Sequence, residues 1–144
     1  MFLIDAALFH PLIGQFYDRS ALSEMSDIAV QDRHGPAIFI KDLSELEMDS
    51  DISVLSAIGA SEPSYYVISD HLAEAGCFGV LDMSNREKSL AALIGAMSPK
   101  FSQRKYLFDG TDVFLIPMSL RDVIVVNHDD KVLRFSGLPL RDSG

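Results

Sequence analysis

The 144-residue sequence contains a single cysteine, Cys77, and no tryptophan. One cysteine cannot form a disulfide within the chain, so an ordinary apolar core must hold the fold together. A lone cysteine also fits a reducing compartment, and we expect a cytoplasmic protein. Residues 1–9 are mostly apolar, but they include Asp5 and no basic residue. His10 and Pro11 follow them. They are a poor match to a signal peptide and are too short to span a bilayer.

The short motifs of the common enzyme classes are also missing. The sequence has no Gly-rich phosphate-binding loop, no Gly-x-Ser-x-Gly, no His-Glu-x-x-His, no Cys-x-x-Cys and no EF-hand spacing. Basic residues do not alternate with aromatic ones as they do in proteins that bind single-stranded nucleic acid. We therefore expect no cofactor, and we favour a binding function over an enzymatic one.

Positive charge is scarce in the first half of the chain. Residues 1–75 hold three basic and thirteen acidic residues, a net charge of −10, whereas residues 76–144 have a net charge of +1. This distribution disfavours binding to nucleic acid or to an anionic membrane, and it favours a basic protein partner. The alternative is that the acidic surface only keeps the protein soluble, which requires no partner.

What is present points to one globular domain. Apolar residues make up 48% of the chain and charged residues 23%, which is ordinary globular composition. We expect a single domain over residues 1–137 and a flexible polar tail over residues 138–144. We find no internal repeat and no linker inside the chain.

The clearest structural pattern is a β-meander over residues 106–136. Strands are predicted at residues 106–108, 113–116, 123–126 and 132–135, with polar turn residues between them. The preceding part mixes short strands at residues 36–41 and 77–81 with helices. The helices are predicted after Pro11, from Ser20, before Gly59, over residues 61–75 and over residues 85–97. A strand over residues 65–68 competes with the fourth helix. The predicted fold is α+β, with N-terminal helices and short strands packed on a mostly antiparallel C-terminal β-meander.

Half of the residues from 42 to 51, which we call the acidic segment, are carboxylates. They are Asp42, Glu45, Glu47, Asp49 and Asp51. Ser44 and Glu47 have the spacing of a helix capping box, so the segment is predicted to lead into a helix. We predict that these five carboxylates bind the basic partner, because opposite charge accelerates encounter. The alternative is the solvated face of a surface helix.

A second candidate site lies at the predicted hairpin tip over residues 127–130. An imidazole beside two carboxylates can bind a metal or transfer protons, which makes His128, Asp129 and Asp130 candidate metal ligands. Asn and Asp are also the residues that tight turns favour, and we prefer the turn as the explanation. Asp109 and Asp112, at the first predicted hairpin, could lie at the same end of the sheet or at the opposite end.

The remaining histidines and the cysteine give weaker patterns. His71 and Glu74 are three residues apart on a predicted helix, which suits metal ligands, but the pattern has no second copy and favours an exposed ion pair. His10 and His34 stand in turn contexts. Cys77 is expected to be a small buried apolar residue rather than a nucleophile.

These observations favour a small acidic cytoplasmic protein that binds another protein. The expected class is an inhibitor, immunity protein or antitoxin that neutralises a basic partner such as a nuclease toxin. One alternative is a metal-dependent enzyme that uses the His128 cluster. Another is a regulatory domain that forms a homodimer through its sheet.

Overall fold

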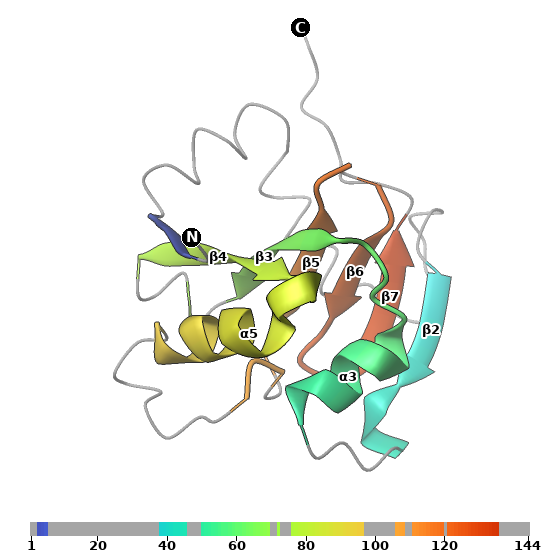
Figure 1. Ribbon diagram of the computed structural model, residues 1–144. Coiled ribbons are helices and arrows are strands. Elements are labelled where there is room, and N and C mark those ends of the chain that lie inside the picture. Colours follow the sequence, from blue (N-terminus) through green and yellow to red (C-terminus); the bar gives the residue numbers. More distant parts are fainter. Residues whose placement is uncertain are drawn as a thin grey trace, which may run out of the picture.

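The computed structural model describes residues 3–5, 38–45, 50–69, 72, 76–96, 106–108, 111–119 and 121–135, which form an α+β fold (Figure 1). In chain order the elements are β1 (Leu3–Asp5), β2 (Ile38–Asp42), the 3₁₀ helix η1 (Leu43–Glu45), α3 (Asp51–Ile58), β3 (Ser64–Ser69), β4 (Cys77–Asp82), the 3₁₀ helix η2 (Met83–Asn85), α5 (Arg86–Gly95), β5 (Val113–Pro117), β6 (Val123–Val126) and β7 (Lys131–Phe135).

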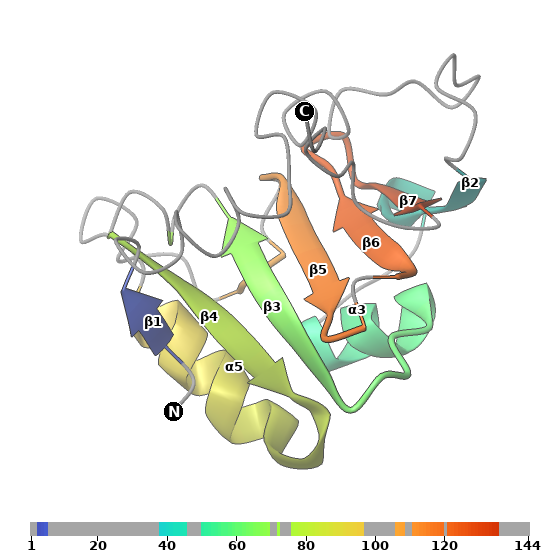
Figure 2. The ribbon, with the colours of Figure 1, turned by 90° about the horizontal axis from the view of Figure 1, so that it is seen from above.

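The seven described strands form one antiparallel sheet in the order β1-β4-β3-β5-β6-β7-β2. Figure 2 shows this order, from β1 at one edge to β2 at the other. In Figure 1, β3 and β4 run across the direction of β6 and β7, as expected from the twist that accumulates between neighbouring strands. The β2 strand comes from the first half of the chain and pairs with the last strand, β7.

The predicted meander is confirmed for three of its four strands, because β5, β6 and β7 are consecutive neighbours. The prediction of a strand at residues 106–108 is wrong. Both sides of β5 are already taken, by β3 and β6, so the meander has no place for a further strand there. Leu107 is fully buried. Its N–H donates to the carboxylate of Asp51 and not to a strand.

The prediction of a helix over residues 61–75 is also wrong for residues 61–69, since residues 64–69 form β3. The competing strand interpretation is confirmed. Burial alternates along β3, with Tyr65, Val67 and Ser69 inside. A period of two is that of a strand with one face more deeply buried than the other. The pairing with β4 and β5 overrides the helical spacing of the apolar residues.

Local hydrogen bonds explain where α3 begins and ends. Ser50 has an extended backbone, and its hydroxyl accepts the N–H of Ser53 at 3.1 Å, which caps the helix. Gly59 ends it in the left-handed conformation at φ 73°, as the glycine predicts. The predicted capping residue Ser44 instead lies in η1.

The helix predicted over residues 85–97 is confirmed as α5, which ends at Gly95. The expected cap, Ser84, lies in η2, where its N–H and hydroxyl donate to Asp82 at 3.0 and 2.7 Å. Ser44 donates to Asp42 in the same way, at 3.0 and 2.6 Å. The sequence Asp-x-Ser thus ends two strands, β2 and β4, and each time a 3₁₀ turn and an α-helix follow. This local recurrence is not apparent from the sequence.

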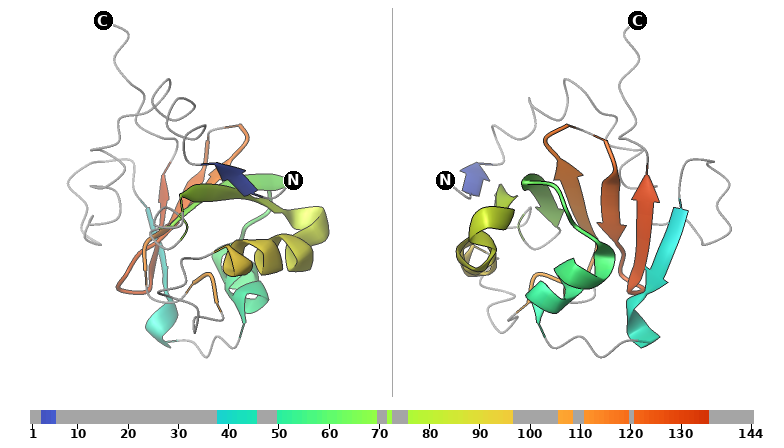
Figure 3. Two further views of the ribbon diagram at one scale, coloured as in Figure 1. Left: turned by 90° about the vertical axis from the view of Figure 1, so that its left-hand side faces the viewer. Right: turned by 45° about the vertical axis from the view of Figure 1, so that its right-hand side comes forward.

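The helices α3 and α5 lie on the same face of the sheet (Figure 3). Their residues Leu55 and Leu93 pack in one cluster with sheet residues such as Val67, Leu115 and Ile124. The opposite face also carries buried side chains. These are Phe78, Phe114, Ile116, Val123, Val125, Leu133 and Phe135. Burial on both faces explains why β5 and β6 are continuous apolar runs rather than alternating ones.

Several predictions fall outside the described residues. They include the helices after Pro11 and from Ser20 and the tail over residues 138–144. In the described part of the chain, no helix combines the length and hydrophobicity that crossing a membrane requires.

Candidate functional site

The turn between β6 and β7 is built on the buried side chain of Asn127. Its Oδ1 accepts the N–H groups of Asp129 and Lys131 at 2.9 and 3.0 Å. The N–H of Asp130 donates to the Asn127 carbonyl at 3.0 Å, and Asp130 has a left-handed backbone at φ 60°. The residues therefore form the turn that their types predict, with an Asp in the αL position that closes a three-residue hairpin loop.

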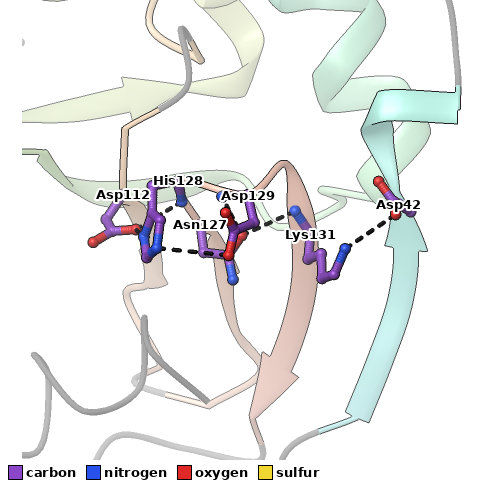
Figure 4. A network of polar contacts seen from close by, with 6 residues as sticks. All are labelled: Asp42, Asp112, Asn127, His128, Asp129 and Lys131. Atoms are coloured by element: carbon purple, nitrogen blue, oxygen red, sulfur yellow. Dashed lines mark hydrogen bonds and ion pairs between the residues drawn. The ribbon is translucent and has the colours of Figure 1, made fainter. Parts of the chain in front are cut away.

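His128 projects from this turn, with 48% of its side chain exposed, and it lies between two carboxylates (Figure 4). Its Nδ1 is 2.9 Å from Asp112 Oδ1, and its backbone N–H donates to the same oxygen at 2.8 Å. Its Nε2 is 3.6 Å from Asp129 Oδ2. The contact with Asp112 selects a ring with the proton on Nδ1, because an ionised carboxylate can only accept a hydrogen bond.

Asp112 is the partner of His128 that the sequence left unassigned. Val113 at the start of β5 pairs with Val126 at the end of β6, so the residue before β5 faces the residues that follow β6. The same reasoning applied to the predicted strands would have placed Asp112 at the His128 end. The sequence contained that information in the antiparallel register rather than in any motif.

The predicted metal ligands do not form a metal site in this arrangement. Among the described residues, no group of three or more His, Cys, Asp and Glu side chains is placed so that it could hold a metal ion. The backbone carbonyl of Asp130 accepts the N–H of Leu43 at 2.7 Å, which ties the turn to η1.

This tie brings the start of the acidic segment beside the hairpin. Asp42 pairs with Lys131 across β2 and β7, and Lys131 Nζ lies 3.1 Å from Asp42 Oδ2 (Figure 4). Hydrogen bonds from the Ser44 side chain, and then from Lys131 and the Ser44 backbone, hold the pKa of Asp42 below its usual value. The carboxylate therefore stays ionised at the end of β2.

The prediction that Asp51 is one of the docking carboxylates is wrong, because the residue is buried. Only 6% of it is exposed. Its Oδ2 accepts the N–H of Leu107 at 2.8 Å, and its Oδ1 accepts that of Phe108 at 3.2 Å. It is the first residue of α3, where a carboxylate is favourable, but it faces inward and satisfies two backbone donors of a distant segment. It cannot contribute to a surface in this fold.

The other predicted residues divide into described and undescribed ones. Glu45 ends η1, directly beside the hairpin tie, whereas Glu47 and Asp49 lie outside the described residues. Cys77, in β4, is half-buried and packs against the core. The remaining candidates outside the described residues are His10, His34, His71, Glu74 and Asp109.

The result is a set of carboxylates at one end of the sheet, which we call the acidic end. Its members are Asp42, Asp112, Asp129 and Asp130, and the backbone of Glu45 in η1 follows directly after the end of β2. These carboxylates come from β2, from the residue before β5 and from the β6–β7 turn, so no single stretch of sequence predicts the set. The arrangement suits electrostatic binding, because carboxylates can accept hydrogen bonds from Lys and Arg and 67% of the Asp129 side chain is exposed.

Comparisons with protein-family models, with curated proteins and with solved structures found no match to this chain.

Proposed function

We propose that this chain is a small acidic protein-binding module that neutralises a basic protein partner, in the manner of an inhibitor, immunity protein or antitoxin. The partner docks on the acidic end. A basic nuclease toxin has the right chemistry, since its phosphate-binding Lys and Arg side chains would meet carboxylates instead.

One observation carries the proposal. The ion pair from Lys131 to Asp42 and the hydrogen bond from Leu43 to Asp130 join two acidic stretches that are distant in the chain. Lys131 and Asp42 are 89 residues apart. Acidic residues of both halves thereby reach one end of the sheet, and 67% of the Asp129 side chain is exposed there. The net charge of −10 over residues 1–75 adds a long-range field of the same sign.

The role of Asp42 in this proposal differs from that of the other carboxylates. It is already paired with Lys131 and with Ser44, so its contribution is to hold η1 against the hairpin. Asp129 and Glu45 are the residues that we expect to meet the partner. Mutation of an exposed charge at the rim of an interface typically changes the association rate and its salt dependence.

Affinity capture from the native cell tests the proposal. The wild-type chain, the double variant Glu45→Lys/Asp129→Lys and the single variant Glu87→Lys would each be immobilised. Glu87 is exposed on α5, so it controls for a change of charge on another element. We expect a basic protein that elutes at high salt from the wild type and from Glu87→Lys but not from the double variant. Equal capture by the double variant would contradict the proposal.

A further inference from the structure

We draw no further inference here: the strongest candidate, the His128 imidazole between Asp112 and Asp129 on the β6–β7 turn, belongs to the site already described, and no group of three or more His, Cys, Asp and Glu side chains in the described part of the chain could hold a metal ion there.

Discussion

The carboxylate of Asp51 accepts the backbone N–H of Leu107 at 2.8 Å, although the two residues are 56 positions apart in the chain. Its second oxygen accepts the N–H of Phe108. One buried side chain therefore connects the start of α3 to the segment that precedes β5, beside the fully buried Leu107. Asp51 therefore has a structural role. For this reason we assign partner docking to the acidic end of the sheet rather than to the whole acidic segment.

Replacement of this carboxylate should be strongly destabilising. Asp51→Ala leaves two backbone N–H groups without their acceptor, and we expect the free energy of unfolding to fall by about 3 kcal/mol. Asp51→Asn keeps one acceptor oxygen and should lose less. Urea denaturation measures both variants, and a loss below about 1 kcal/mol for Asp51→Ala would show that these bonds contribute little.

The Asn127 side chain should be needed for the β6–β7 turn. Asn127→Ala removes the oxygen that accepts two N–H groups of the turn, and we expect a loss of about 2 kcal/mol. Asn127→Asp retains an acceptor at the same position and serves as the matched control. If both variants had the same stability as the wild type in urea denaturation, the turn would not depend on this side chain.

Asp130 should report the conformational cost of the αL position. At φ 60° a side chain with a Cβ is strained, whereas glycine is not. We expect Asp130→Gly to be more stable than Asp130→Ala by about 1 kcal/mol. Both substitutions remove the same charge, so their difference isolates the backbone term. Thermal denaturation of the pair measures it, and equal melting temperatures would contradict the assigned turn.

Acid should weaken the Asp42 turn. The Ser44 side chain, followed by Lys131, lowers the pKa of Asp42 in the folded state below the ordinary value of 3.8. A group with a depressed folded pKa stabilises the fold above the unfolded value, and this contribution is lost as the pH falls through the folded value. Asp82 should behave in the same way because the Ser84 side chain and N–H lower its pKa.

Urea denaturation at about pH 5 and about pH 3 tests this expectation. Stability should fall between the two conditions for the wild type, and the fall should be smaller for Asp42→Asn. Ser44→Ala removes the hydroxyl but keeps the backbone N–H, so NMR should find the pKa of Asp42 higher than in the wild type. An unchanged Asp42 titration in Ser44→Ala would show that the hydroxyl is not the main cause.

The outer edge of β2 should not mediate dimerisation. The strand has an irregular register between Phe39 and Lys41, and Lys41 is exposed. Bulges and edge lysines are features that prevent strands from pairing between molecules. We expect sedimentation velocity to give a monomer at every concentration. A concentration-dependent dimer that Lys41→Val strengthens would instead support the homodimer hypothesis.

The sequence predicts the strands β5 to β7 well because apolar runs there alternate with turn residues that have a definite conformational role. It predicts helix caps poorly. Ser44, Ser50 and Ser84 all have capping chemistry. Only Ser50 caps a helix, whereas Ser44 and Ser84 donate to the Asp two residues before them. Residues 106–108 likewise cannot form a strand beside β5, because β3 and β6 already pair with it.

The candidate site was predictable only in part. Turn chemistry at Asn127 follows from residue type, but the contact between Asp42 and Lys131 requires the pairing of β2 with β7, which no local pattern encodes. Burial of Asp51 has the same origin, since its partner lies in a distant loop. Counting the charged residues along the sequence identifies acidic stretches, but it does not show which carboxylates face solvent.

The salt dependence of partner binding tests the central claim most directly. The affinity of the captured basic protein would be measured for the wild type, Glu45→Lys/Asp129→Lys and Glu87→Lys at low and at physiological ionic strength. The account predicts that the double variant binds about tenfold more weakly or worse at low salt and loses most of the salt dependence, while Glu87→Lys stays close to wild type. An unchanged affinity and salt dependence in the double variant would contradict docking on the acidic end.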